Sequence, residues 1–342
     1  MPDDFMTLYR LREAANGQRR LSIERDSTPQ PGPHEVRVRL RAASLNYRDL
    51  MVLDGRANAV DGLVPLSDGA GEVDAIGDGV TRWANGDRVA GLFFQAWETG
   101  RYKTAFSKST LGGNSQNGML SEYITLPESG ITGIGSRLTW QEAATLPCAA
   151  LTAWQAMFER TKVTSRDTVL ILGTGGVASF AMQFAHAVGA RTIVLSSSPK
   201  KLAQVREFGA TTTIDYTAVP EWDKAVLKVT GGEGVTLVIE NGGPATFDRS
   251  LASLAPGGRI AQVGVLTGFG PTSNLMRLQN INADIMGITV GSAEHFRSML
   301  LFIEQHRIVP IIDKAFDFAD ASHAYTHLRE ARHVGKVAIL FR

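Results

Sequence analysis

Cysteine is nearly missing from this sequence, and neither sign of charge is in excess. Cys148 is the only cysteine among 342 residues, which excludes a disulfide framework within the chain and any zinc site built from four thiolates. A single thiol also suits a reducing compartment. Lys and Arg number 35 against 34 Asp and Glu, so the composition gives no reason to expect a nucleic-acid partner.

The sequence also offers no clear segment for export or membrane insertion. Residues 1–7 carry neither the basic nor the apolar region of a signal peptide, and we therefore predict a cytoplasmic protein. Residues 168–190 have no formally charged side chain and are long enough to cross a bilayer, but glycines at 173, 175 and 176 would interrupt a spanning helix. A strand, a glycine turn and a buried helix explain this stretch better, so no membrane association is expected.

The turn signals divide the chain into two kinds of sequence. Up to about residue 130, short alternating runs such as Val36–Leu40 lie between glycine turns, which is typical of a β-rich domain. Residues 95–120 are polar with little periodicity and are predicted to form a long surface loop. From Thr139, which forms a capping-box pattern with Glu142, strands alternate with helices. This alternation predicts an α/β fold with a doubly wound parallel sheet of the Rossmann type.

The same patterns predict the element boundaries and the domains. Strands of the parallel sheet are predicted at 168–172, 192–196, 212–214, 235–240, 259–263 and 284–288, and its helices near 177–188, 200–208, 221–229 and 244–254. The C-terminal part is predicted to form a helix near 292–305, a strand at 315–318, a helix near 320–331 and a strand at 336–341. We assign residues 1–134 and 290–342 to the β-rich domain and residues 135–289 to the Rossmann domain.

The sharpest motif is the run VLILGTGGVA, residues 169–178, in which glycines follow a buried strand and open a helix. Gly173 and Gly175 permit a tight turn and bring backbone N–H groups close to a pyrophosphate at the positive end of the helix. Ala178 takes the third position, which the dinucleotide fingerprint allows. An ordinary glycine-rich turn is the alternative, but the four strand–helix units behind this turn favour a dinucleotide site.

The end of the next strand decides between the two nicotinamide cofactors. NAD sites place an acidic residue there, whereas this sequence reads SSSPKK at residues 196–201. Hydroxyl and ammonium groups can hold a 2′-phosphate, so we predict NADP(H). The alternative is that Lys200 and Lys201 only form the solvated first turn of a helix, where the helix dipole disfavours cations.

Further motifs run along nearly the whole chain. They are ASLNYRD at 43–49, VPLSDGAGEV at 64–73, GDRV at 86–89, TLPCAALTAW at 145–154, the glycine turn and GKVAIL at 335–340. In this order they resemble the zinc-free branch of the medium-chain dehydrogenase/reductases, the quinone oxidoreductase-like proteins. The resemblance implies a GroES-like fold for the β-rich domain beside a Rossmann domain, and it does not identify a substrate.

The resemblance also implies that no metal is bound. Zinc-dependent relatives carry Cys, His and Glu where this sequence has Asn46, Ser67 and Asp68, so only Cys148 falls on a ligand position. One thiolate cannot hold Zn²⁺, and the segment 95–120 has none of the four cysteines of a structural zinc lobe. Cys148 is expected to be a small buried residue near the cofactor.

Without a metal, the protein would activate a carbonyl through hydrogen bonds, which suits quinones and enones better than unactivated alcohols or ketones. We predict an NADPH-dependent oxidoreductase that transfers hydride to a conjugated carbonyl of a small molecule. The alternatives are an NADP-dependent alcohol dehydrogenase or aldehyde reductase, and a nucleotide-binding module without turnover. Intact glycines at 173, 175 and 176, and at both ends of the run 264–268, favour a working cofactor pocket.

The resemblance assigns roles to single residues. Asn46 would orient the nicotinamide or the substrate oxygen, and Tyr47 is the candidate proton donor, with packing at the cleft wall as its alternative role. The turn at residues 240–243 would form the rim of the nicotinamide pocket, or it only starts a helix. The predicted cofactor-binding residues are Asn46, Thr152, Gly173, Thr174, Gly175, Gly176, Val177, Ser196, Ser197, Ser198, Lys201, Tyr216, Asn241, Gly242, Gly264, Val265, Leu266, Gly287 and Lys336.

Two carboxylates fall beside the position of the missing metal. The resemblance places Asp49 and Asp68 there, with Lys336 opposite Asp68. Carboxylates that lie close together repel unless a cation or a proton compensates, so Lys336 or Arg48 should pair with them. The alternative is that one aspartate is protonated near neutral pH and serves as a general acid, although a nearby ammonium would lower its pKa.

The resemblance finally implies a homodimer formed through the Rossmann sheet. The apolar, weakly charged segment 284–290 would be a suitable edge strand, because an exposed edge invites a partner strand.

Overall fold

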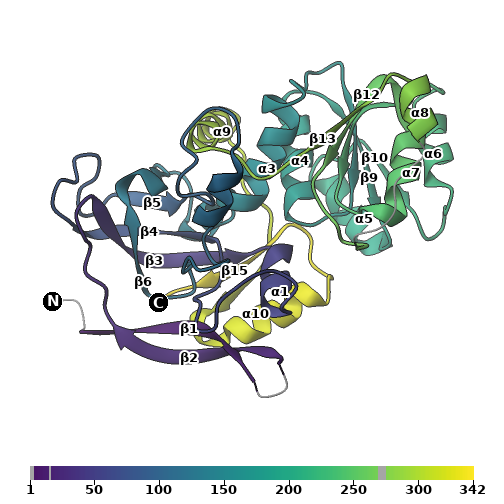
Figure 1. The fold of residues 1–342 in the computed structure, drawn as a ribbon. Coiled ribbons are helices and arrows are strands. Elements are labelled where there is room, and N and C mark those ends of the chain that lie inside the picture. The colour runs from purple at the N-terminus through teal and green to yellow at the C-terminus, as the bar shows by residue number, and fades with distance from the viewer. Residues whose placement is uncertain (1–3, 15–16, 269–274) are drawn as a thin grey trace. The chain divides into compact units, whose positions relative to one another are not determined.

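The computed structural model describes residues 4–14, 17–268 and 275–342, which form two compact units (Figure 1). Unit 1 comprises Met1–Leu151 and Gly291–Arg342, and unit 2 comprises Thr152–Val290. The division differs from the expected domain boundaries at residue 290, which belongs to unit 2, and in the segment 135–151, which belongs to unit 1. Its helix α2 (Trp140–Ala144) packs against the sheet of unit 1, and this contact could not be read from the helical pattern alone.

Unit 2 is built on a parallel sheet that has six strands among the described residues. The strands are β8 (Thr168–Leu172), β9 (Arg191–Ser196), β10 (Thr212–Asp215), β11 (Val235–Glu240), β12 (Leu254–Gln262) and β13 (Asp284–Gly287). Their order is β10-β9-β8-β11-β12-β13, so the chain first builds outward from β8 and then restarts on the other side of β8. Ligands of such sheets bind at the carboxyl edge where the order reverses. The predicted fold class is confirmed.

Helices connect consecutive strands of unit 2. They are α4 (Gly176–Ala187), α5 (Pro199–Glu207), α6 (Trp222–Val229), α7 (Pro244–Ala252) and α8 (Leu275–Asn280), preceded by α3 (Leu151–Trp154) and a π-helical turn at Gln155–Glu159. Strand β8 is buried along its whole length, as expected for a parallel strand covered on both faces. The strand, glycine turn and helix predicted for residues 168–190 are present. Among the described residues, no helix combines the length and the apolar character that crossing a bilayer requires.

Unit 1 contains a seven-stranded sheet and a two-stranded ribbon in its described part. The sheet strands are β3 (Glu35–Leu45), β4 (Asp68–Ile76), β5 (Arg88–Gly91), β6 (Tyr123–Pro127), β7 (Ile131–Gly133), β14 (Ile312–Asp317) and β15 (Lys336–Leu340), and the ribbon strands are β1 (Phe5–Glu13) and β2 (Arg19–Ser27). Their order is β14-β15-β3-β4-β5-β7, with β6 also paired to β3. Only β14 and β15 run parallel among the described pairs of this sheet. The C-terminal strand β15 therefore lies beside β3 from the N-terminal part of the chain.

Four helices with short 3₁₀ and π-helical turns complete the described part of unit 1. The helices are α1 (Tyr47–Leu53), α2, α9 (Ala293–Gln305) and α10 (Ala321–Arg329), and the turns are Thr104–Ser109, Glu128–Gly130, Leu146–Ala150 and Phe318–Asp320. The capping box predicted at the start of α2 is present, because the Thr139 side chain accepts from the Glu142 backbone N–H and the Glu142 carboxylate accepts from the Thr139 N–H.

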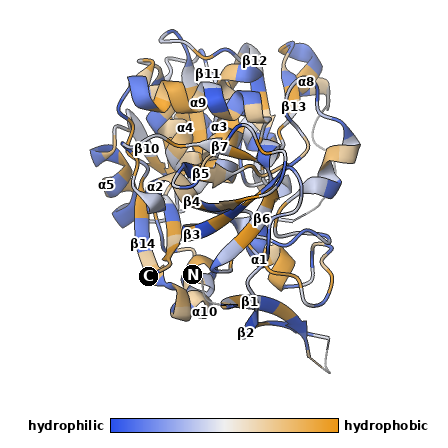
Figure 2. Cartoon of the chain, turned by 90° about the vertical axis from the view of Figure 1, so that its left-hand side faces the viewer, coloured by the Kyte–Doolittle hydropathy of each residue, from blue (hydrophilic) through white to orange (hydrophobic). Residues whose placement is uncertain are grey.

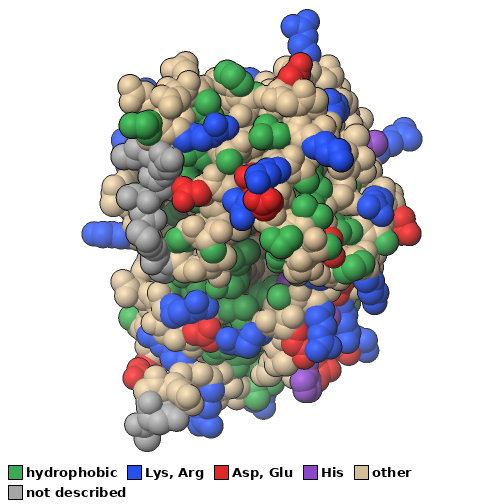
Figure 3. Space-filling view, turned by 90° about the vertical axis from the view of Figure 1, so that its right-hand side faces the viewer, with side chains coloured by type: hydrophobic (Ala, Val, Ile, Leu, Met, Phe, Trp, Pro, Cys, Tyr) green, Lys and Arg blue, Asp and Glu red, His purple; other side chains and the backbone are tan. Residues whose placement is uncertain are grey.

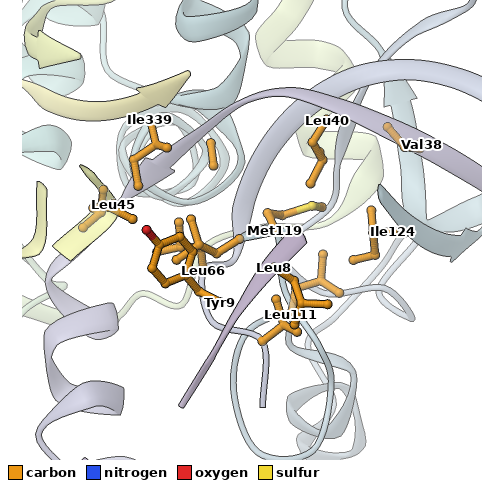
Figure 4. Close-up of a cluster of buried hydrophobic side chains, with 14 of the residues drawn as sticks. Leu8, Tyr9, Val38, Leu40, Leu45, Leu66, Leu111, Met119, Ile124 and Ile339 are labelled. Carbon is orange, nitrogen blue, oxygen red and sulfur yellow. The ribbon is translucent and has the colours of Figure 1, made fainter. Parts of the chain in front are cut away.

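The core of unit 1 gathers side chains from strands that are distant in sequence. Figure 4 shows Leu8 and Tyr9 of β1 beside residues of β3, β6 and β15, together with Leu66, Leu111 and Met119 from connecting segments. Strand β2 is mostly hydrophilic, as its colour in Figure 2 shows, and it is only partly covered. On the face drawn in Figure 3, basic and acidic side chains lie interspersed, in keeping with their nearly equal numbers.

The prediction of a long surface loop at 95–120 is wrong in one respect, because several of its residues are buried. Trp97, Leu111 and Leu120 are each at most 2% exposed. Trp97 stacks on Phe106 with ring centroids 6.0 Å apart, and it meets His295 of α9 edge-on at 5.9 Å. This segment forms a small aromatic lobe. The lobe could not be predicted from the sequence, because contacts of this kind follow neither the helical nor the strand period.

We expect Gly71→Ala in β4 to destabilise the protein by about 1–3 kcal/mol, because an added Cβ would overlap the Arg39 carbonyl oxygen of the neighbouring strand. Gly133→Ala in β7 of the same sheet is the matched control, since its added Cβ would lie 3.7 Å or more from its nearest neighbour, in ordinary contact. Urea unfolding of both variants measures the effect. Equal stability of the two variants would contradict this reading of the β3–β4 contact.

Candidate active site

The predicted cofactor residues of unit 2 gather at the carboxyl edge of its parallel sheet. All but a few of them lie at or just beyond the end of a strand: Gly173 after β8, Ser196 in β9, Tyr216 after β10, Asn241 after β11, Gly264 after β12 and Gly287 in β13. Parallel strands bring their carboxyl ends to one edge, so residues far apart in sequence lie along the same rim. Thr152 lies apart from them in α3, where it is buried.

The turn after β8 leaves room for a phosphate. Gly173 has φ +87°, and a Cβ added to it would meet no atom within 4 Å. Helix α4 begins at Gly176, and its N-cap Gly175 provides no side chain to cap the first backbone N–H groups. Free N–H groups at the positive end of a helix form an anion site, which fits the pyrophosphate of a dinucleotide.

Hydrogen bonds tie this turn to the turns after β11 and β12. Asn241 Nδ2 donates to the Leu172 carbonyl oxygen at 2.9 Å, and the Leu266 N–H donates to the Asn241 carbonyl at 3.3 Å. A Cβ on Gly264 would overlap the same Asn241 carbonyl oxygen. The glycine at 264 is therefore required by close packing of two turns, a reason that the sequence did not reveal.

Glu240 holds the start of α7 and was not recognised as a functional group from the sequence. It is fully buried, and its Oε1 accepts from the Gly242 N–H at 2.7 Å, the Gly243 N–H at 3.0 Å and the Thr246 hydroxyl at 2.7 Å, while Ser250 donates to Oε2. The turn at 240–243 starts helix α7, which is one of the two roles that were considered for it. The acidic residue directly before the sequence Asn-Gly-Gly-Pro could have predicted this cap of α7.

The segment after β9 presents hydroxyl and ammonium groups. Ser198 caps α5 by accepting from the Lys201 N–H at 3.4 Å, and Ser196 Oγ accepts from the Ser198 N–H at 3.3 Å. Because both side-chain oxygens act as acceptors here, their own O–H groups remain available to donate. Ser197 and Lys200 are exposed.

One acidic residue near this segment was not predicted from the sequence. Asp215 is the register partner of Ser196 on the neighbouring strand β10. Its Oδ1 accepts from the Thr217 hydroxyl at 2.6 Å and the Thr217 N–H at 2.9 Å, and these bonds lower the pKa of Asp215. The carboxylate is thus ionised and turned into its own loop. Only strand register shows that it lies close to the serines.

In unit 1, a buried cation lies beside Asp68. Lys336 Nζ is 3.7 Å from Asp68 Oδ2, and the two side chains are 2% and 0% exposed. The ammonium also donates to the Leu45 carbonyl oxygen at 2.7 Å and to Asn46 Oδ1 at 2.5 Å. This pairing is the one that the sequence predicted.

The remaining groups around Asp68 complete its hydrogen bonds. Ser67 Oγ donates to Asp68 Oδ1 at 2.7 Å, and the Cys148 N–H donates to Oδ2 at 3.2 Å. Burial, and to a lesser degree the charge of Asp68, raise the pKa of the Cys148 thiol above its ordinary range. Both carboxylate oxygens of Asp68 therefore have partners within the protein.

This donor set does not fit zinc. It offers one carboxylate that already faces an ammonium, one thiol and the neutral groups of Asn46 and Ser67, whereas catalytic zinc needs three anionic or imidazole ligands. Within 4–14, 17–268 and 275–342, no group of three or more His, Cys, Asp or Glu side chains is placed to hold a metal ion.

Asn46 and Tyr47 both offer hydrogen-bond donors. Asn46 Nδ2 is buried and has no partner among the described residues, which fits a site that awaits a ligand oxygen. Tyr47 packs partly against the core, and its hydroxyl oxygen lies 3.5 Å from both terminal nitrogens of Arg56. Since a guanidinium only donates, the Tyr47 oxygen accepts from it and keeps its own O–H for another acceptor. Arg56 was not anticipated, because the contact arises only when the chain turns back after α1.

Asp49 lies buried at the start of α1. Its Oδ2 accepts from the Asn46 backbone N–H at 2.7 Å and its Oδ1 from Arg48 Nη1 at 3.1 Å. Burial raises the pKa of Asp49 to about 6, against the lowering effect of Arg48 and with added repulsion from Asp68. The expectation that a neighbouring cation sets the direction of the shift is wrong for Asp49, because desolvation outweighs the partly exposed Arg48. The spacing Asn46-x-x-Asp49 was an unused capping signal.

Known proteins resemble this chain over nearly its whole length. Residues 32–136 match the alcohol dehydrogenase GroES-like domain, and residues 176–305 match the domain described as zinc-binding dehydrogenase. A zinc-type alcohol dehydrogenase-like protein of Schizosaccharomyces pombe is 40% identical over 97% of this chain and 98% of its own. A quinone oxidoreductase of Pseudomonas aeruginosa is 32% identical over 97% and 99%, and an acryloyl-coenzyme A reductase of Metallosphaera sedula is 30% identical over 91% and 93%.

Solved structures show the same similarity over nearly the whole chain. A structure described as an alcohol dehydrogenase from Sinorhizobium meliloti 1021 is 36% identical with a TM-score of 0.93 and full coverage of both chains. An NAD-dependent alcohol dehydrogenase is 32% identical with a TM-score of 0.86 over 98% and 99% of the two chains. A quinone oxidoreductase of Pseudomonas syringae pv. Tomato DC3000 is 27% identical with a TM-score of 0.81 over 98% and 99%. The chain is a medium-chain dehydrogenase/reductase.

The protein belongs to the quinone oxidoreductase-like branch and is an NAD(P)H-dependent oxidoreductase. Its GroES-like domain and its Rossmann-type sheet confirm the predicted fold, and the predicted family is confirmed with them. A nicotinamide cofactor fits the open glycine turn after β8.

We expect the free energy of unfolding to carry the signature of Asp49. Because its pKa in the folded protein is about 6 and thus above the ordinary value of 3.8, the folded state binds this proton more tightly than the unfolded state. The resulting stabilisation is fully present below about pH 4 and is lost as the pH rises to about 6, by about 3 kcal/mol. Urea unfolding of wild type and Asp49→Asn at several pH values measures this loss. The free energy of unfolding of wild type minus that of the variant should fall as the pH rises. Parallel curves for the two proteins would contradict the assignment.

Proposed function

We propose that this oxidoreductase uses NADPH to reduce a conjugated carbonyl of the quinone or enone type, without a metal. The observation that carries the proposal is the arrangement around Lys336, which faces Asp68 and binds Asn46 Oδ1 while the Asn46 Nδ2 donor stays unpartnered. A hydrogen bond polarises a carbonyl less than a metal ion does. A conjugated acceptor takes hydride more easily than an isolated ketone and therefore suits this site.

Relatives support both this function and a second candidate. The names of two relatives refer to quinones and to acryloyl-coenzyme A, and both kinds of molecule contain a conjugated carbonyl. Other relatives are named alcohol dehydrogenases, which keeps an alcohol dehydrogenase or aldehyde reductase as the second candidate. A nucleotide-binding module without turnover is set aside, because the chain belongs to a family of oxidoreductases.

In the proposed reaction the nicotinamide supplies hydride, and the protein binds, orients and protonates. The turn after β8 and the first turn of α4 would hold the pyrophosphate. Asn46 Nδ2 would donate to the nicotinamide carboxamide or to the substrate oxygen. Tyr47 would give its O–H proton to the reduced substrate, and the neighbouring Arg56 guanidinium would stabilise the phenolate left behind.

The preference for NADPH rests on the segment after β9. Ser197 and Lys200 are exposed, and the hydroxyl groups of Ser196 and Ser198 can still donate, so a 2′-phosphate would meet several donors there. The acid that is in register with Ser196, Asp215, already accepts hydrogen bonds from its own loop. The structure of an NAD-dependent relative shows the competing possibility, and cofactor kinetics decide between the two.

The function is tested by following NADPH absorbance with a panel of quinones, enones, simple ketones and aldehydes. We expect turnover with the conjugated acceptors, no loss of activity after treatment with a chelator, and less than stoichiometric zinc by elemental analysis. About one zinc per chain that is lost together with activity would contradict the metal-free mechanism. Turnover confined to aldehydes or alcohols would favour the second candidate.

We expect Lys201→Glu to weaken NADPH by roughly ten- to a hundredfold in KM, since it would remove a positive charge near the proposed phosphate and add a negative one. NADH should change little. Lys228→Glu is the matched control, because Lys228 is exposed in the last turn of α6, away from the carboxyl edge of the sheet. Equal losses for NADPH and NADH in Lys201→Glu would remove the basis for the NADP assignment.

We also propose that the protein is a homodimer joined through the edge of the unit 2 sheet. Strand β13 is one of the two edge strands of the described sheet, and Ile285 on it is 44% exposed. Light scattering at micromolar concentration should give twice the mass of one chain. Ile285→Lys should shift the mass toward a single chain with the fold retained by circular dichroism. A wild-type mass of one chain would reject the dimer.

A further inference from the structure

We propose that Lys336 is a positioning residue that fixes the orientation of the Asn46 side-chain amide, so that the site presents an N–H donor and accepts a ligand carbonyl oxygen. The proposal rests on the proposed function, in which Asn46 faces the cofactor or the substrate. Lys336 was predicted from the sequence to bind the cofactor, whereas here it acts on the side chain of Asn46.

The chemistry of the two groups determines the orientation of the amide. An ammonium has three donors and no acceptor, whereas the Asn46 amide has an oxygen that accepts and an NH₂ that donates. Lys336 Nζ lies 2.5 Å from Asn46 Oδ1, and only the oxygen can occupy that place. A flipped amide would put two donors against each other. Nδ2 is therefore held on the other side, where it is buried and unpartnered among the described residues.

Lys336 is itself immobilised, so it can act as a fixed reference. It is the first residue of β15, and its neighbour Val337 is in register with Leu45 of β3, directly before Asn46. Nζ donates to the Leu45 carbonyl oxygen at 2.7 Å and faces Asp68 at 3.7 Å. The Asp49 carboxylate holds the Asn46 backbone N–H at 2.7 Å, so backbone and side chain of Asn46 are fixed from two sides.

Burial explains why Lys336 acts through Asn46 rather than by contact. Its side chain is 2% exposed, and its charge already has two hydrogen-bond acceptors and a carboxylate around it. A buried donor without a partner is unfavourable, so Asn46 Nδ2 selects a ligand atom that accepts. A carboxamide or carbonyl oxygen meets this requirement. A group that only donates does not.

A double-mutant cycle tests the coupling. Asn46→Ala, Lys336→Met and the double variant are compared by kcat/KM with NADPH and a quinone. We expect Asn46→Ala to lower kcat/KM by roughly ten- to a hundredfold and the double variant to be no worse than Asn46→Ala within about twofold. Losses that multiply in the double variant would overturn the proposal, because they would mean that Lys336 acts independently of Asn46.

Lys314→Met is the matched control, since Lys314 is exposed on the adjacent strand β14 and undergoes the same chemical change. It should leave kcat/KM unchanged and should be additive with Asn46→Ala. Lys336→Met leaves the buried carboxylate of Asp68 without a cation and can fail to fold for that reason. In that case the variant Lys336→Met/Asp68→Asn, which removes both charges together, replaces it in the cycle.

A spectroscopic measurement decides the orientation independently of turnover. The side-chain amide signal of Asn46 in ¹⁵N-labelled protein is identified by its loss in Asn46→Ala. We expect it to shift or double in Lys336→Met and to stay unchanged in Lys314→Met. An unchanged signal in Lys336→Met would overturn the positioning role. Wild-type protein without turnover on any quinone or enone would instead overturn the proposed function, and the amide signal would still decide the role of Lys336.

Discussion

The buried ion pair between Lys336 and Asp68 is the interaction on which the arrangement of unit 1 depends. It joins β15, which follows the return of the chain from unit 2, to the first residue of β4, and through Asn46 it reaches the start of α1. Removing one partner of such a pair strands a charge in a low-dielectric interior, at a cost of about 3–5 kcal/mol. The pair is tolerated because Leu45, Asn46, Ser67 and Cys148 supply the hydrogen bonds that water would otherwise make. The same bonds prepare one unpartnered donor for a ligand.

Two aspartates in the same region have different surroundings. Asp68 faces an ammonium that is as deeply buried as itself, whereas Asp49 faces Arg48, whose side chain is 22% exposed and shared with backbone carbonyl groups. Desolvation therefore dominates at Asp49 and raises its pKa to about 6. A neighbouring cation therefore does not by itself set the direction of the pKa shift of Asp49, because burial of the carboxylate acts against it.

Unit 2 shows a similar use of a buried charge. Glu240 has four hydrogen-bond donors and lies at the start of α7, where the helix dipole favours an anion. It fixes the turn that bonds to β8 through Asn241. Rigid turns keep the strand ends at the carboxyl edge in fixed places, so the buried Glu240 contributes to the shape of this edge.

The sequence by itself determined the parallel sheet, the glycine turn and the family, because strand–helix alternation and turn glycines act over short stretches of chain. It also predicted the pairing of Lys336 with Asp68, through the resemblance of motifs far apart in sequence. Other contacts between distant segments were decided only by the tertiary structure. The packing of α2 on the sheet of unit 1, the buried aromatic lobe around Trp97, the closeness of Asp215 to Ser196 and the reach of Arg56 to Tyr47 all arise from strand register and chain reversal. No periodicity within a segment encodes these contacts, because each depends on where a second segment is placed beside the first.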